Sequence, residues 1–233
     1  MATLQTMPAI ALLPAQLAAL GVHWNTAANV LPKAQGEALG SLCDNAVGTA
    51  IATMLGGIPI LAPINKKSLL RPQPDCVEVG HSRVIGGIRP QNFDVIYRPD
   101  GVRFAYDSKT LNARNSLGKN YRNMINDLGT EAATVHTRYP SAIVAFIVAV
   151  PEPCLGNHTW NLINVLRRLS GRQATSDEAY KAEAISLVIW DPLTGVIDGA
   201  VPAADSNLRI EKFSIHVESC YVDRFAGLPP HSK

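Results

Sequence analysis

The spacing of hydrophobic residues divides the chain into helical and extended segments. Apolar residues that recur every three or four positions predict four helices, at residues 8–21, 33–55, 116–138 and 159–170. Runs rich in Val, Ile and aromatic residues predict strands at residues 76–79, 83–88, 92–97, 102–110, 142–150 and 185–190. An alternation through Ile210, Phe213, Ile215 and Val217 predicts one more strand within residues 208–222.

The order of these segments predicts the fold class. A helix, a meander of strands, a second helix and a fully apolar strand favour an α/β (α+β) fold, with a mixed central β-sheet flanked by helices. Because no repeat and no Ser/Gly linker interrupts the pattern, we expect residues 1–233 to form a single domain.

The clearest local prediction is an antiparallel hairpin formed by residues 92–97 and 102–110. The connection Arg98-Pro99-Asp100-Gly101 is a typical turn sequence, since proline presets one backbone dihedral and glycine tolerates a positive one. The strong strand character on both sides of this turn supports the hairpin.

Composition narrows the class of protein without revealing its function. A net charge of +2 is too small to indicate a partner, so any basic surface must be local. The four scattered cysteines predict reduced, mostly buried thiols, and the start of the chain lacks the charged n-region of a signal peptide. The uncharged stretch 46–64 contains glycine and proline breakers, so we expect a buried helix and loop, no membrane partner, and a cytoplasmic location.

Three polar residues of the hairpin are the main candidates for chemistry. Asp94 begins the first strand, whereas Asp107 and Lys109 stand near the end of the second. Antiparallel pairing brings these ends together, and alternation puts Asp107 and Lys109 on one face with Ser108 on the other. The two carboxylates, with the carbonyl oxygen of Ser108, suit a hard divalent cation that polarises a phosphodiester, while the lysine orients or deprotonates water.

Asp94, the short turn and Asp107-Ser108-Lys109 resemble the PD-(D/E)XK nuclease superfamily, which includes many type II restriction endonucleases. The resemblance covers residues 33–150, as a catalytic nuclease core with a restriction-endonuclease-like fold. It departs from the motif at Phe93, where the family name places proline. In that family the helix before the meander often contributes another acid, which Glu37 matches best here and Asp44 second.

The resemblance implies an endodeoxyribonuclease that hydrolyses double-stranded DNA with Mg²⁺ as its cofactor. Mn²⁺ would substitute for Mg²⁺. Asp94 and Asp107 would hold the metal, Lys109 would position water and Glu37 would assist. The additions at residues 151–233 would serve DNA recognition or dimerisation, because a homodimer is the natural way to cut both strands of a palindromic site. A repair, phage or transposon nuclease of the same fold, or an inactive binding module, is the alternative.

Cations after the hairpin are candidates for nucleic-acid contacts. Arg114, Lys119 and Arg122 stand among several Asn and Ser residues, a composition suited to phosphates near a scissile bond, although a solvated helix start explains it equally well. Arg83 and Arg89, which flank a strand beside the centre, are weaker phosphate candidates.

The six histidines form no zinc or His-metal motif. His81 stands just before the first acid strand, where it could approach the site, but a structural histidine is the favoured interpretation. No P-loop or dinucleotide fingerprint occurs, so we expect no nucleotide cofactor.

Overall fold

A mixed six-stranded sheet organises the computed structural model, which describes residues 2–73 and 75–232, without the side chains of 2, 115–120, 158 and 232. The strand order is β2-β3-β4-β5-β6-β7. β3, β4 and β5 are antiparallel to one another, whereas β5, β6 and β7 are parallel. The strands are β2 (Ile60–Leu61), β3 (Val77–Ile85), β4 (Pro90–Tyr97), β5 (Phe104–Thr110), β6 (Ile143–Pro151) and β7 (Ala184–Trp190).

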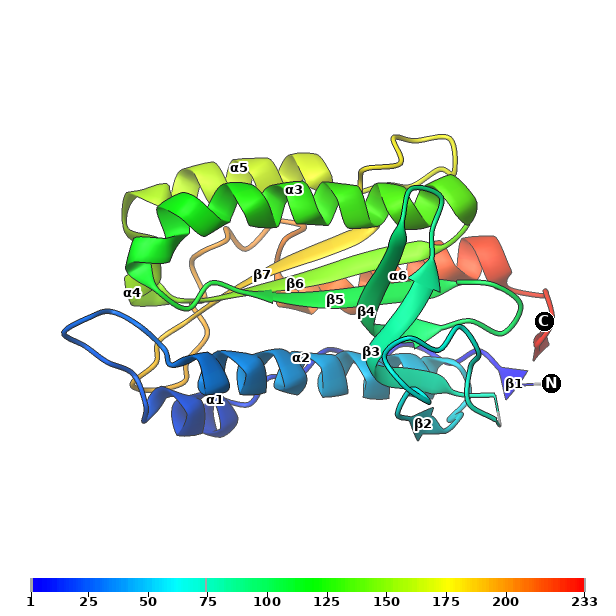
Figure 1. The fold of residues 1–233 in the computed structure, drawn as a ribbon, viewed down its shortest axis with the longest axis horizontal. Coiled ribbons are helices and arrows are strands. Elements are labelled where there is room, and N and C mark those ends of the chain that lie inside the picture. Colours follow the sequence, from blue (N-terminus) through cyan, green and yellow to red (C-terminus); the bar gives the residue numbers. More distant parts are fainter. Residues whose placement is uncertain (1, 74, 233) are drawn as a thin grey trace.

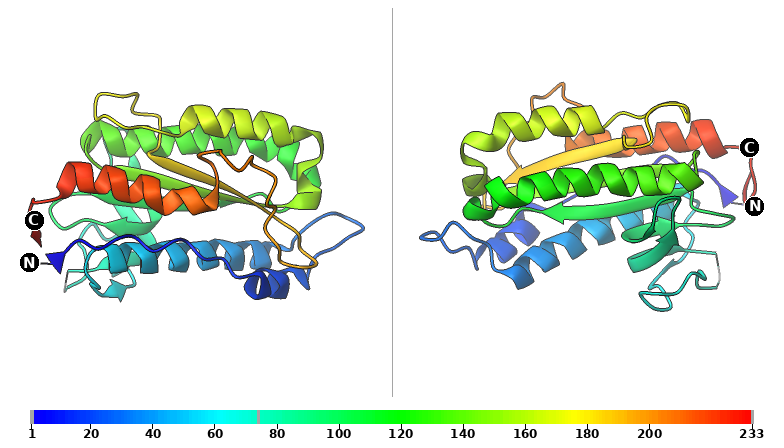
Figure 2. Two further views of the ribbon diagram at one scale, coloured as in Figure 1. Left: turned by 180° about the vertical axis from the view of Figure 1, so that it is seen from behind. Right: turned by 45° about the horizontal axis from the view of Figure 1, so that its top comes forward.

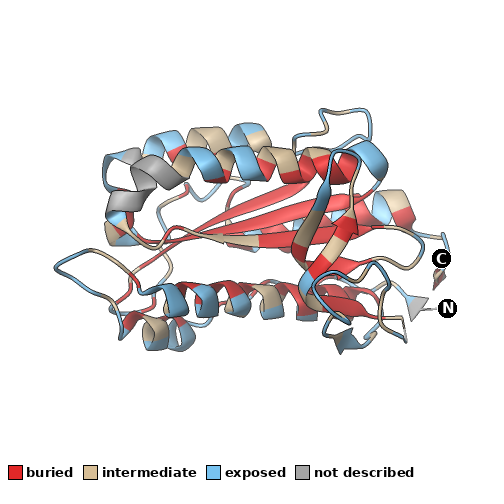
Figure 3. Cartoon of the chain, in the orientation of Figure 1, coloured by how far each residue is buried: buried red, intermediate tan, exposed pale blue. Residues whose placement is uncertain are grey.

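Helices cover both faces of this sheet (Figures 1 and 2). One face carries α1 (Pro14–Gly21), α2 (Lys33–Met54) and α6 (Ile210–Phe225), and the other carries α3 (Arg114–Arg138) and α5 (Thr159–Leu169). Every residue of β6 is buried between the two layers, which agrees with the apolar run in its sequence (Figure 3). The predicted mixed sheet flanked by helices is confirmed.

The predicted hairpin is confirmed, and β3 extends it into a three-stranded meander. β4 pairs with β5 across the turn that follows Tyr97, with Val95 opposite Tyr106. The two short strands predicted at 76–79 and 83–88 are one strand, β3, whose register with β4 shifts between Val79 and Ser82. Gly80 has a φ of +126° in this irregular stretch, a conformation that favours glycine.

The strand predicted within residues 208–222 is wrong, because this segment is helix α6. Its buried residues recur at helical spacing: Ile210, Phe213, Ser214, Val217, Cys220 and Tyr221. Ile215, which made the sequence look alternating, is 57% exposed. The apparent period of two thus came from one solvent-facing isoleucine between two core residues.

Smaller elements complete the chain. Only the second half of the helix predicted at residues 8–21 forms, because α1 begins at Pro14, a residue favoured at the first helical position. β1 (Ala2–Thr3) pairs with β8 (His231–Ser232), so the ends of the chain lie side by side. α4 (Glu152–Leu155) and a 3₁₀ turn (Gly156–His158) connect β6 to α5.

Two further expectations concern the cysteines and the apolar stretch at residues 46–64. All four cysteines are free and buried, as expected from their scattered positions. Within the described parts of the chain, no helix is both long enough and apolar enough to cross a bilayer.

Candidate functional site

The candidate site lies where β4 and β5 part. Their pairing ends at Val95 and Tyr106, so Asp94 and Asp107 are the next residues on the two strands. Asp94 accepts hydrogen bonds at Oδ2 from the backbone N–H of Ser108 at 3.2 Å and from its hydroxyl at 3.3 Å. Asp107 lies beside Asp94 at the end of the paired strands, and this neighbour raises its pKa. The expected meeting of the two acids is therefore present.

Residues of β5 divide between two faces, as alternation predicts. Lys109 Nζ forms an ion pair with Asp107 and another with Glu131 Oε1 of α3, at 2.9 Å. Ser108 points to the opposite face, where its hydroxyl lies close to Gly40 of α2. Asp94 bonds to Ser108 and lies beside Asp107, which point to opposite faces of β5. The site therefore includes both faces at the end of β5.

Glu131 was missed by the sequence analysis, although its position carried a signal. Its side chain is 4% exposed, and its Oε1 accepts a second hydrogen bond from Gln91 at 3.0 Å. Met124, Leu128, Ala132 and Val135 form the buried face of α3 beside it. A carboxylate next to such a face needs a partner, and the only nearby lysine of the hairpin supplies one.

Small residues bring α2 close to the hairpin and select which helix acid reaches it. Gly36, Gly40, Asp44 and Gly48 follow one another at intervals of four, so they form one stripe along the helix. A Cβ atom on Gly48 would lie 2.4 Å from Val79 Cγ2, and one on Gly36 would lie 2.1 Å from Asn112 Nδ2. Because only glycine permits this approach, Asp44 interacts with both Asp94 and Ser108.

Glu37, the preferred helix acid in the sequence analysis, lies outside this stripe. Its side chain is 68% exposed and is 3.5 Å from Lys33, an ion pair within one turn of α2. It lines the rim of the same cavity as Asp44, but the structure brings Asp44 rather than Glu37 against the strand residues. The signal for Asp44 was the glycine spacing on either side of it.

His81 reaches the site as well. The irregular segment of β3 at Gly80 turns this histidine toward β4, so that Nδ1 is 3.3 Å from Asp94 Oδ1. The ring is 57% exposed. His81 therefore approaches the site, and the glycine inside a strand pattern was the available signal for this position.

The site brings its carboxyl groups close together in a buried place, which disfavours their ionised forms. Burial and the charge of Asp94 raise the pKa of Asp44 to about 8, and an interaction with Ser108 partly offsets them. Burial and the neighbouring Asp94 also hold the pKa of Asp107 well above its usual range, although Lys109 opposes them. Burial alone would lower the pKa of Lys109, but Asp107 and Glu131 raise it. An added cation would relieve this crowding.

The Mg²⁺ implied by the family resemblance is compatible with these donors. Among the described side chains, no three His, Cys, Asp or Glu residues already converge as a metal-binding group. Mg²⁺, however, is usually held by one or two carboxylates and keeps several waters. Asp94 and Asp107 would supply two such ligands, and the buried Oδ1 of Asp44 has no hydrogen-bond partner among the described residues. The donors are all hard oxygens, which Mg²⁺ prefers.

Two cavities open on either side of β5. One, of about 710 Å³, contains Asp44, Asp94, His81 and Ser108, and the other, of about 530 Å³, contains Lys109 and Asp127. Both are lined by Lys33, Ser108, Thr110 and Asn112, so they meet at the end of the strand.

Cations around these cavities differ from those expected. Lys33 and Lys66 line the larger cavity and were not predicted as contacts. Arg114 and Arg122 are exposed on α3 but line neither cavity. The side chain of Lys119 falls outside the described residues, so its predicted contact stays a prediction.

Comparisons with protein-family models, with curated proteins and with solved structures find nothing that matches this chain.

Proposed function

We propose that this protein is a Mg²⁺-dependent endonuclease of the PD-(D/E)XK type that hydrolyses phosphodiester bonds in double-stranded DNA, most like a type II restriction enzyme. The observation that carries the proposal is the meeting of Asp94, Asp107 and Lys109 at the end of the hairpin. The order α2, β3, β4, β5, α3, β6 is the element order expected for a restriction-endonuclease-like core, which supports the same reading.

Each residue has a distinct role in this proposal. Asp94 and Asp107, with the carbonyl of Ser108, would hold Mg²⁺, and Mn²⁺ would substitute for it. The metal would supply charge stabilisation on the phosphoryl oxygens. Lys109 would orient a water molecule for attack on phosphorus, and Glu131, which binds the same ammonium group, would fix its position. A homodimer would let two such sites cut both strands.

Incubation with supercoiled plasmid tests the proposal. We expect cleavage with Mg²⁺ or Mn²⁺ and none with EDTA. Discrete fragments would indicate a restriction-type enzyme, because sequence-specific cutting yields defined lengths. A smear or simple nicking would favour a repair, phage or transposon nuclease of the same fold. Binding without hydrolysis under any of these divalent-metal conditions would identify a binding module and contradict the proposal.

Substitution of each acid of α2 tests whether Asp44 or Glu37 assists cleavage. Asp44→Asn removes a carboxylate that interacts with Asp94 and Ser108, so we expect cleavage to slow by roughly 10- to 100-fold, as for other outer-shell partners of a metal site. Glu37→Gln, the matched change on the same helix, removes only an exposed pair with Lys33 and is expected to slow it less than about threefold. Steady-state cleavage of a labelled duplex measures both rates. A larger loss of cleavage rate in Glu37→Gln than in Asp44→Asn would identify Glu37 as the assisting acid.

A further inference from the structure

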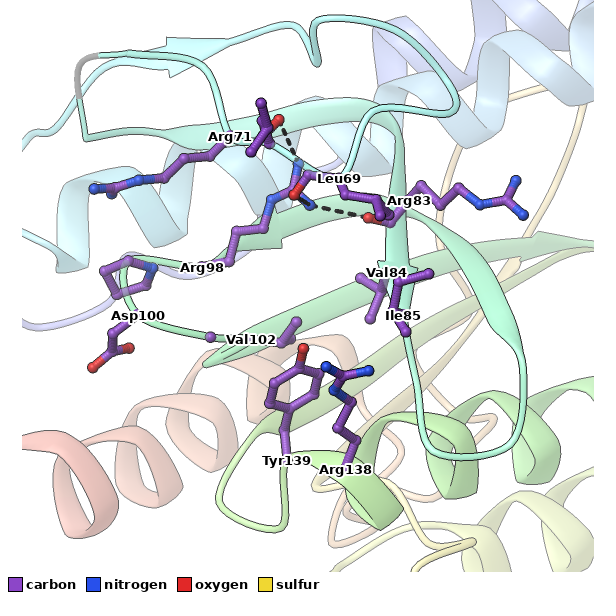
Figure 4. Close-up of a pocket in the computed structure, with 13 residues that line it drawn as sticks. Leu69, Arg71, Arg83, Val84, Ile85, Arg98, Asp100, Val102, Arg138 and Tyr139 are labelled. Atoms are coloured by element: carbon purple, nitrogen blue, oxygen red, sulfur yellow. Dashed lines mark hydrogen bonds between the residues drawn. The ribbon is translucent and has the colours of Figure 1, made fainter.

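A third cavity, rich in arginine, lies beside the candidate site. It measures about 400 Å³, and we call it the arginine pocket. Residues from four segments line it: the loop at 69–71, the end of β3, the β4–β5 turn and the end of α3. Its cations are Arg71, Arg83, Arg98 and Arg138 (Figure 4).

Two of these arginines already have carboxylate partners. Arg98 binds both carboxylate oxygens of Glu78, at 2.6 and 2.8 Å, and donates to the backbone carbonyls of Leu69, Leu70 and Arg83. It therefore fixes the 69–71 loop to β3. Arg71 forms an ion pair with Asp75. These two guanidinium groups mainly hold the pocket together.

Arg83 and Arg138 are available to a ligand. Among the described residues neither has a carboxylate partner, and Arg138 lies over the ring of Tyr139, 5.7 Å from its centroid. Figure 4 shows Arg71 and Arg83 extending outward in opposite directions, while Arg138 and Tyr139 rise from the end of α3. The two free cations thus come from different segments, Arg83 from β3 and Arg138 from the end of α3. They suit an extended polyanion with charges at intervals.

The arginine pocket is a neighbour of the candidate site along two segments. On β3, His81 lines the site cavity and Arg83 lines the pocket, a separation of two residues or about 7 Å. In the preceding loop, Lys66 lines the site cavity and residues 69–71 line the pocket. One chain-like ligand can therefore reach both cavities.

We propose that the arginine pocket binds the phosphodiester backbone of the nucleic acid that enters the candidate site, an inference that rests on the proposed function. Arg83 and Arg138 contact phosphates outside the scissile position and set the register of the substrate. Such contacts carry no base specificity, so the pocket contributes affinity and orientation.

The salt dependence of duplex binding tests this inference. The double variant Arg83→Gln/Arg138→Gln is compared with Arg167→Gln/Arg168→Gln, which removes two exposed arginines from the last turn of α5. Binding of a labelled duplex is measured by fluorescence anisotropy in EDTA. Loss of two phosphate contacts should reduce the slope of log K against log salt by about 1 to 2, and affinity at low salt by tenfold or more. The control pair should leave both unchanged.

Failures of the two proposals are distinguishable. If the wild type binds duplex without cleaving it in Mg²⁺ and the double variant loses binding, the phosphate-binding role of the arginine pocket is supported and the nuclease function is contradicted. The proposed role of the pocket would be contradicted by an unchanged salt slope in the correctly folded double variant. An equal loss of duplex affinity in the control pair would contradict it as well. Binding of AMP by the wild type, lost in the double variant while duplex binding is retained, would show a small-ligand site and would also overturn it.

Discussion

Asp107→Asn is expected to reduce Mg²⁺-dependent cleavage by roughly 10³-fold. The change removes one of two charged metal ligands, and metal stabilisation of phosphoryl charge is worth several kcal/mol, where about 1.4 kcal/mol corresponds to tenfold in rate. Lys109 keeps its ion pair with Glu131 in the variant, so the hairpin should stay folded. Single-turnover cleavage of a duplex measures the chemical step.

Asp223→Asn is the matched control for this substitution, because the same chemical change falls on an exposed residue of α6. It should leave the cleavage rate within about twofold of wild type, as surface substitutions away from a site usually do. Retained cleavage in Asp107→Asn would remove Asp107 from the centre.

Glu183→Gln is expected to have the largest effect on stability. Glu183 directly precedes β7, and its carboxylate is fully buried. This carboxylate accepts hydrogen bonds from Arg172 at 2.8 Å, from Arg224 at 2.7 Å and from the backbone N–H of Val144 at 2.7 Å. His136 Nε2 lies 3.2 Å from the same group. Its neutralisation leaves two buried guanidinium groups without a counter-charge, which costs about 3–5 kcal/mol.

Urea denaturation measures this loss as a change in the free energy of unfolding. Glu178→Gln is the matched control, since Glu178 forms an exposed pair with Lys181 at 2.8 Å, and such pairs contribute less than about 1 kcal/mol. A loss below about 1 kcal/mol in Glu183→Gln would show that the buried network stabilises the fold far less than its geometry implies.

The same network predicts how stability depends on pH. Burial would raise the pKa of Glu183, but His136, Arg224 and the N–H of Val144 outweigh burial and lower it. A lowered pKa stabilises the folded state above the unfolded value, about 4.3 for Glu, and this stability is lost as pH falls through the folded pKa. The free energy of unfolding should therefore fall below about pH 4, less steeply in Glu183→Gln.

The sequence was sufficient to predict the hairpin and the proximity of its polar residues, because local rules determine both. The Pro-Asp-Gly turn fixes the pairing of β4 and β5, and pairing fixes which ends meet. Alternation then places Lys109 and Ser108 on opposite faces. These features need no information from distant parts of the chain.

Other features depend on packing, which one sequence reveals poorly. α6 was read as a strand because Ile215, which faces solvent, looked like a core position. Glu37 was preferred to Asp44 because the glycine spacing alone does not show how closely α2 approaches the sheet, which depends on the packing of the helix at Gly36, Gly40 and Gly48. Glu131 and His81 reach the site only through the packing of α3 and the irregularity of β3, which are tertiary features.

Cleavage of one plasmid by the wild type and by Asp107→Asn tests most directly whether the hairpin forms a metal-dependent catalytic centre. The cleavage rate is measured across a Mg²⁺ titration, with EDTA as the zero point. We expect metal-dependent cutting by the wild type, and cutting by the variant that is slower by about 10³-fold at saturating Mg²⁺. Equal cutting by both proteins, or cutting that persists in EDTA, would contradict a metal centre built on the hairpin.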